Sequence, residues 1–249
     1  ACFFLCFSQN MTAQNRKVIG QLWKDFHQTA SDTARMGFLF DLAYKQYANF
    51  DLDSAQILLA EMRRICPKTG FDMGQYMIHI TSGFLANRQY LFDESIAQYD
   101  SAVVFAHKLN DGTLIGRVFN NLGGTYQKKG EFRTALDYFN RARAAVPPEN
   151  MQLLWGILSN TAAAYGNMDM ISESARYSAQ ALELARSYGD VADQLHSINT
   201  LFQNYALLED APNMEKWGYL LDSLSQITQN NKHFHNAMYA RGTIAFKKK

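Results

Sequence analysis

The sequence predicts an all-α protein in which helical hairpins stack into a solenoid. Helix breakers are rare, with only four prolines among the 249 residues. Similar sequence recurs about every 40 residues, and each period contains two amphipathic segments of helical length separated by a short polar turn. A period of this kind is typical of repeat proteins, in which each hairpin buries its apolar face against its neighbours.

The clearest copy of the repeat lies between Phe119 and Pro147. Small residues and large apolar residues occupy its characteristic positions: Leu122, Gly123, Tyr126, Ala135, Phe139 and Ala142. Small residues recur at the equivalent positions 40 residues earlier and 39 residues later: Gly83, Ser95 and Ala102, and then Ala162, Ser174 and Ala181. Small side chains let neighbouring helices approach closely, which explains a glycine at position 123 despite its low helix propensity.

The pattern of this copy resembles the tetratricopeptide repeat. The residues that match its signature are Phe119, Leu122, Gly123, Tyr126, Gly130, Ala135, Phe139, Ala142 and Pro147. The other copies are looser, and their period exceeds the usual 34 or so residues, which implies longer helices or loops. The resemblance covers about residues 32–249. It implies a right-handed superhelix whose first helices line a concave surface.

We expect three segments along the chain. They are the remnant of a signal peptide at 1–13, a capping helix at 14–31 and the repeat domain at 32–249. The expected repeats lie near 36–75, 76–115, 116–154, 155–194 and 195–234, with a partial repeat at 235–249. Asp32 and Thr33 are the residues expected to cap the opening helix. Because the partial repeat lacks a second helix, we expect the natural protein to continue beyond it.

The first residues, ACFFLCF, form an apolar block that is too short to span a bilayer. The segment Thr12-Ala13-Gln14 follows soon after, and the combination resembles the end of a secretory signal peptide cleaved after Ala13. The alternative is an apolar N-terminal helix that caps the fold. No later run of about 18 apolar residues occurs, so we expect membrane attachment only through a segment downstream of this sequence.

The sequence contains no arrangement of residues that is typical of an enzyme. It lacks the GxSxG, Walker A, HExxH and CxxC motifs. His233 and His235 have no carboxylate or cysteine neighbours at metal-ligand spacing, which favours an ordinary polar loop. The formal net charge of +1 indicates no general attraction to nucleic acid. We therefore expect no catalysis, no cofactor, no metal and no nucleic-acid partner.

By the same resemblance, we expect a protein or peptide ligand to bind the surface formed by the first helix of each repeat. The predicted binding residues are Tyr44, Phe84, Asn120, Asn121, Gly124, Gln127, Lys128, Asn160 and Asn199. Other positions of the same predicted surface are Phe40, Tyr47, Ile80, Arg117, Ser159, Asn167 and Gln203. The packing signature requires a small residue at Gly123 but not at Gly124, so we expect Gly124 to leave an opening in the surface.

Three asparagines of this surface, Asn121, Asn160 and Asn199, follow one another at intervals of 39 residues. An amide both donates and accepts hydrogen bonds, so a ladder of three could hold an extended peptide through its backbone. The alternative is that these are polar positions beside the packing point of each repeat. The last repeat aligns best one residue out of phase, which would aim Asn199 elsewhere.

Two functions remain open from the sequence. The stretch from Lys24 to Met62 resembles the start of the extracytoplasmic repeat region of bacterial regulators, either histidine kinases or transcriptional regulators. This resemblance implies an exported, periplasmic or extracytoplasmic sensing module that binds a protein or peptide. The alternative is a cytoplasmic scaffold or peptide-sensing adaptor. Oligomerisation is compatible with both.

Overall fold

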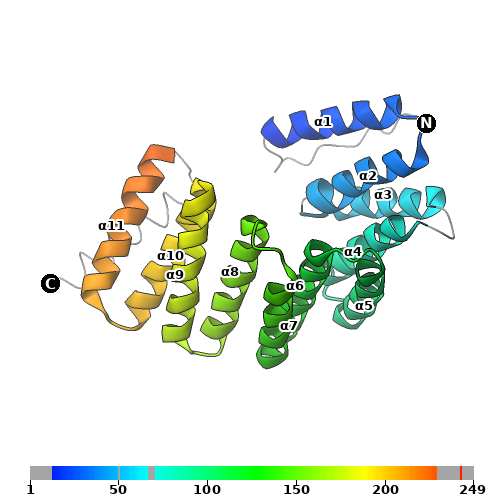
Figure 1. Ribbon diagram of the computed structural model, residues 1–249. Coiled ribbons are helices and arrows are strands. Elements are labelled where there is room, and N and C mark those ends of the chain that lie inside the picture. The colour runs from blue at the N-terminus through cyan, green and yellow to red at the C-terminus, as the bar shows by residue number, and fades with distance from the viewer. Residues whose placement is uncertain (1–12, 50, 67–70, 229–241, 243–249) are drawn as a thin grey trace. The chain divides into compact units, whose positions relative to one another are not determined.

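The structure, a computed structural model, describes residues 13–49, 51–66, 71–228 and 242 (Figure 1). Every element in that part of the chain is helical, so the all-α prediction is confirmed. The expected leader, apart from Ala13, and the expected partial repeat, apart from Gly242, lie outside the described residues. The chain divides into two compact units, residues 1–125 and residues 126–249, and each is described by itself.

The first unit contains an N-terminal helix, two hairpins and most of a further helix. In chain order its elements are α1 (Ala13–Gln28), α2 (Asp32–Phe40), η1 (Asp41–Gln46), η2 (Tyr47–Asn49), α3 (Leu52–Ile65), α4 (Asp72–Arg88), α5 (Phe92–Lys108) and α6 (Gly112–Lys129), which continues into the second unit. The continuous run α2–η1–η2 is the first helix of the first hairpin, and α3 is the second. The next hairpin is formed by α4 and α5, which lie side by side (Figure 1).

Up to Thr228, the second unit contains five helices after α6. They are α7 (Phe132–Ala145), α8 (Met151–Asn167), α9 (Ile171–Tyr188), α10 (Val191–Leu207) and α11 (Ala211–Thr228). Helix α8 pairs with α9, α10 pairs with α11, and α9 also packs against α10, so each hairpin contacts the next one. The core between the last hairpins is built mainly from Leu182, Leu195, Ile198, Leu201 and Phe202.

Glycine lets α4 and α5 approach closely. A Cβ atom added at Gly83 would lie 2.7 Å from ring carbons of Tyr99, which is only 1% exposed. Ser95 on α5 donates its hydroxyl to the carbonyl of Gly83 at 2.8 Å. The two helices therefore meet at Gly83 because a side chain is absent there, as the small positions of the repeat predict.

Buried polar pairs join the second helix of one hairpin to the first helix of the next. They are Ser95 with Thr125, whose hydroxyl oxygens lie 3.3 Å apart, and Ser174 with Asn204, whose Nδ2 donates to the serine Oγ at 3.0 Å. In each pair the partners are 30 residues apart in the chain. The equivalent positions of the intervening repeat carry Ala135 and Ala164, both fully buried. Buried hydroxyl groups need such partners, because an unpaired one would destabilise the fold.

Four turns within hairpins share one backbone conformation. The residue with a positive φ in each is Tyr90 (62°), Gly130 (86°), Asp169 (59°) and Glu209 (56°). In the first of these turns the N–H of Leu91 donates to the carbonyl of Ala86 at 3.0 Å, and in the second the N–H of Glu131 donates to that of Tyr126 at 2.9 Å. This is the left-handed helix ending that usually carries glycine. Only one of the four turns has a glycine at that position.

The opening helix begins with an ordinary N-cap but does not stay α-helical to its end. Its N-cap is Ser31, whose extended backbone lets its Oγ accept from the N–H of Ala34 at 3.4 Å. The prediction of Asp32 and Thr33 as caps was therefore wrong, since the helix already includes Asp32. The backbone then takes π-helical form over Asp41–Gln46 and 3-10 form over Tyr47–Asn49. A π-helical turn holds more residues than an α-helical turn, so it changes which later side chains share a face.

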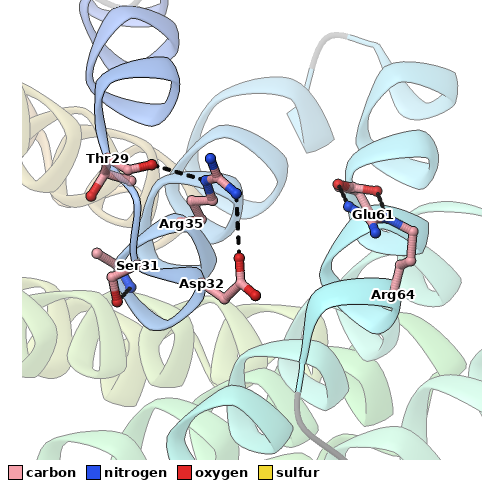
Figure 2. A network of polar contacts seen from close by, with 7 residues as sticks. Thr29, Ser31, Asp32, Arg35, Glu61 and Arg64 are labelled. Atoms are coloured by element: carbon pink, nitrogen blue, oxygen red, sulfur yellow. Dashed lines mark hydrogen bonds and ion pairs between the residues drawn. The ribbon is translucent and has the colours of Figure 1, made fainter.

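A small polar network holds α1 to the start of α2 (Figure 2). Arg35 Nε donates to the carbonyl of Thr29 at 3.0 Å, and its Nη1 lies 3.4 Å from Asp32. The same guanidinium lies over the ring of Phe26 on α1, 5.8 Å from its centroid. These contacts position α1 against the first hairpin. The nearby pair of Glu61 and Arg64, at 2.6 and 2.7 Å, is a surface contact within α3.

Candidate functional site

In the first unit, three aromatic rings from two successive first helices meet. Phe40 and Tyr44 stack with their centroids 5.1 Å apart, and Phe84 of α4 meets Tyr44 edge-on, also at 5.1 Å. Tyr44 and Phe84 are half-buried, whereas Phe40 is only 9% exposed. Both arrangements are favourable geometries for aromatic pairs. The structure therefore brings together the two aromatic residues predicted for the site.

A long-range hydrogen bond joins this group to α6. Asn121 Nδ2 donates to the hydroxyl oxygen of Tyr44 at 3.0 Å, across 77 residues of sequence. Burial raises the pKa of Tyr44, while the hydrogen bond from Asn121 and the nearby charge of Arg117 act in the opposite direction. We call Phe40, Tyr44, Phe84 and Asn121 the aromatic–amide surface. Its polar centre is the paired hydroxyl and amide.

The face of α6 that carries Asn121 also carries Arg117 and Gly124, one turn before and one turn after it. Arg117 is half-buried. A Cβ atom added at Gly124 would meet no atom within 4 Å, so space lies beside the helix at this point. Asn120 and, beyond the unit boundary, Gln127 are half-buried, whereas Lys128 is exposed. Their role in binding stays a prediction.

Besides Phe40, which is largely buried, two residues expected on this surface belong to the core. Tyr47 and Ile80 are both fully buried. In a regular α-helix Tyr47 would share a face with Phe40, seven residues earlier, but the intervening π-helical turn rotates it away. Ile80 packs inside the first unit, on the side of α4 that also carries the buried residues Tyr76 and Gly83. The predicted surface is therefore smaller than expected.

In the second unit, Asn160 on α8 and Asn199 on α10 are both half-buried. The buried polar pairs define how the repeats correspond, because Asn204 contacts Ser174 as Thr125 contacts Ser95. Positions 125 and 204 are 79 residues apart, so Asn199 corresponds to Asn120, as 199 − 120 = 79, and not to Asn121. The asparagine ladder is therefore out of register at its third member. Asn160 still corresponds to Asn121, 39 residues before it.

One half-buried aromatic residue of the second unit was missed by the sequence analysis. Trp155 Nε1 on α8 donates to Ser197 Oγ on α10 at 3.1 Å, and its ring meets that of His196 edge-on at 5.7 Å. The position 39 residues earlier is Gly116, so the repeat pattern did not indicate a large side chain here. The available signal was the tryptophan itself, one of only three in the chain.

The described residues show neither a cluster of metal ligands nor a membrane-spanning helix. Within 13–49, 51–66, 71–228 and 242, no three His, Cys, Asp or Glu side chains gather as they would around a metal ion. In that same part of the chain, no helix combines the length and apolar character needed to cross a bilayer.

Comparisons with known proteins place the fold. No protein-family model matches the sequence, and no curated protein matches it either. Solved structures do match. BtubC from P. vanneervenii shares 16% identity, with a TM-score of 0.69, over 88% of this chain and 91% of its own.

Two further structures resemble the chain over most of its length. A STAND signal-transduction ATPase with a tetratricopeptide repeat sensor, from Pyrococcus horikoshii, has 14% identity and a TM-score of 0.74 over 94% of this chain and 37% of its own. The Rap conjugation gene regulator of plasmid pLS20, solved with the Phr* peptide, has 17% identity and a TM-score of 0.64 over 95% of this chain and 71% of its own. At such identities the likeness establishes the fold alone, and that fold is an α-solenoid of the tetratricopeptide repeat kind.

Proposed function

We propose that the chain is a protein- or peptide-binding module without enzymatic activity, and that its ligand contacts the aromatic–amide surface. The observation that carries this proposal is the meeting of Tyr44, Phe84 and Asn121, from three successive hairpins, at one half-buried point. A point assembled from three repeats suits a ligand that runs across them.

The chemistry of the surface fits a peptide. Aromatic rings provide large, rigid contact areas, and they are enriched among the residues that contribute most to binding energy. Asn121 uses one amide N–H for Tyr44, which leaves its second N–H and its carbonyl oxygen available to a peptide backbone. The space beside Gly124 lies one turn further along the same helix.

Proteins with this fold give the proposal a second support. Two Rap proteins resemble the chain at 15% and 17% identity: the first was solved in complex with the competence and sporulation factor, and the second with the Phr* peptide. The STAND relative carries a tetratricopeptide repeat sensor. These are properties of those proteins, and they make a peptide the first ligand class to test here.

Binding can be tested by selecting peptides from a random phage-displayed library against the full chain and measuring their affinities by fluorescence anisotropy. Phe84→Ala should lower the affinity of the selected peptides by at least about tenfold, as expected for an aromatic side chain that contributes about 2 kcal/mol to binding. Tyr138→Ala is the matched control, because Tyr138 is an equally half-buried ring that stacks on Tyr126 in the other unit. If both variants bound the peptides with the same affinity as the wild type, the aromatic–amide surface would be excluded as the binding site.

We further propose that this module is the exported sensing region of a bacterial signalling or transcriptional regulator, with a cytoplasmic scaffold as the alternative. The support is the apolar block before Thr12-Ala13-Gln14 and the resemblance of the stretch from Lys24 to Met62. Mass spectrometry of the protein from its native host should find Gln14 as the first residue. An intact ACFFLCF segment in a soluble cytoplasmic product would favour the alternative.

A further inference from the structure

The second unit contains a hollow that the proposed binding surface does not use. It has a volume of about 430 Å³ and lies among α7, α8 and α9. Its lining residues are Arg143, Leu154, Leu158, Gln180, Glu183, Leu184 and Ser187. The volume lies within the range of small-molecule sites, which are concave and mainly apolar with a few polar groups that orient the ligand.

Three of the lining residues are leucines, and we call them the floor of the hollow. Leu158 is 4% exposed, and Leu154 and Leu184 are half-buried. No aromatic ring lines the hollow among the described residues. An aliphatic side chain seated on this floor would lose contact with water and gain close contacts with three leucines.

Two of the lining residues, Arg143 and Glu183, are exposed side chains of opposite charge, and we call them the rim of the hollow. Arg143 on α7 and Glu183 on α9 form no ion pair or hydrogen bond with any described residue, including each other. The half-buried amide of Gln180 likewise has no described partner. By contrast, Glu173 on the same helix α9 binds Arg176 at 2.6 Å. An unpaired cation and an unpaired anion around one apolar floor complement a ligand that carries both charges and an aliphatic group.

We infer that this hollow binds a free zwitterionic amino acid with an aliphatic side chain. The α-carboxylate pairs with Arg143, the α-ammonium pairs with Glu183, and the side chain rests on Leu154, Leu158 and Leu184. The guanidinium of arginine matches a carboxylate in planar, two-point geometry, which favours this assignment of the ends. The site lies within the second unit and is independent of the aromatic–amide surface in the first.

The experiment is saturation-transfer difference NMR with the full chain and L-leucine or L-leucyl-L-leucine as the probe. We expect the strongest saturation at the leucine methyl protons, because these lie on the apolar floor. L-leucine should give the stronger signal of the two probes, and a stronger signal from the dipeptide would overturn the assignment of a free amino acid. N-acetyl-L-leucinamide, which has the same side chain without either charge, should show little saturation. No saturation of either zwitterion would overturn the inference.

Variants of the rim separate this site from unspecific contact. Arg143→Gln and Glu183→Gln should each lower the affinity for L-leucine by about fivefold, which is the size expected for a contact with an exposed charge. Glu183→Gln should also remove the discrimination against N-acetyl-L-leucine, which lacks the ammonium group. Arg186→Gln is the matched control, because Arg186 is an exposed arginine of α9 that does not line the hollow. Unchanged methyl saturation in Leu184→Gln, checked for helix content by circular dichroism, would overturn the inference.

Discussion

The amide of Asn121 donates a hydrogen bond to the hydroxyl of Tyr44 at 3.0 Å, although 77 residues separate the two in sequence. Phe84, from the hairpin between them in the chain, contacts the same tyrosine ring. One side chain from each of three successive hairpins therefore meets at Tyr44. The contact makes Asn121 part of the fold as well as part of the proposed binding surface, and this changes how its substitutions should be interpreted.

Tyr44→Phe and Asn121→Ala should each lower the free energy of unfolding by about 1 kcal/mol, the usual net value of such a hydrogen bond. The double variant should lose less than the sum of the two, because both single changes remove the same interaction. Urea denaturation of the four proteins measures this coupling. If the two single losses add up to the loss in the double variant, the hydrogen bond contributes nothing to stability. An effect of Asn121→Ala on ligand affinity could then be attributed to the ligand contact and not to this bond.

Two helical glycines should respond to alanine in opposite directions. At Gly83 the new Cβ would lie 2.7 Å from the ring of Tyr99, so we expect destabilisation by roughly 1–3 kcal/mol from overpacking. At Gly124 the new Cβ would meet nothing within 4 Å, so we expect a gain of about 0.5–1 kcal/mol from helix propensity. Thermal and urea denaturation show whether each variant is more or less stable than the wild type. Equal effects at the two sites would contradict the packing described for α4 and α5.

Replacement of Tyr90 by glycine should stabilise the protein. Tyr90 has a φ of 62° and is 75% exposed. Its left-handed backbone is therefore strained, and its side chain packs too little to offset that strain. We expect Tyr90→Gly to gain about 0.5–1 kcal/mol, and Asp169→Gly to gain less, because aspartate tolerates this conformation better than tyrosine. Gly130→Ala should cost about 1 kcal/mol at the equivalent turn. A larger gain for Asp169→Gly than for Tyr90→Gly in urea denaturation would contradict this explanation.

The carboxyl group of Asp193 should make the stability depend on pH. Burial raises its pKa, while the hydroxyl of Tyr188, which donates to it, acts in the opposite direction. The folded state therefore holds this proton more tightly than the unfolded state, whose pKa is about 3.9. The stability from this group is fully present below that value and is lost as the pH rises through the folded pKa.

Asp193→Asn removes this pH dependence because asparagine does not titrate. Its side-chain carbonyl can still accept the hydrogen bond from Tyr188. The free energy of unfolding of this variant relative to the wild type should rise as the pH increases above about 4, the pKa of the unfolded state. Urea denaturation at several pH values measures the difference. Asp210→Asn is the opposite control, because hydrogen bonds from Asn213 lower the pKa of Asp210. A difference for Asp193→Asn that stays constant with pH would contradict the assigned shift.

Periodicity predicted the helical hairpins because each repeat must present a small residue wherever a neighbouring helix crosses it. Gly83 is the clearest case, since the ring of Tyr99 fills the space that a side chain would need. The identity of the small residue was less informative. From the sequence, Ser95 and Ser174 were predicted only as small residues at packing positions. In the structure their hydroxyl groups also contact the next hairpin.

The candidate site was predicted less well, for reasons that are local to it. A π-helical turn in the opening helix cannot be inferred from a pattern that assumes 3.6 residues per turn, and it moves Tyr47 from the surface to the core. The partner of Asn121 depends on contacts between hairpins that are not adjacent in the chain. Ser31 was passed over as a cap because Asp32 and Thr33 are equally good candidates by residue type.

The buried pairs between hairpins have a consequence for how the chain folds. The equivalent positions alternate in polarity from one repeat to the next: Ser95 and Thr125, then Ala135 and Ala164, then Ser174 and Asn204. Ser95 would keep the carbonyl of Gly83 as its acceptor if another helix took the place of α6, so this junction does not depend on its neighbour. Ser174 differs, because its side-chain hydrogen bonds go to Asn204 of the next hairpin. A helix with alanine at that position would leave the buried hydroxyl of Ser174 without this partner, so we expect this junction to disfavour docking of the wrong repeat.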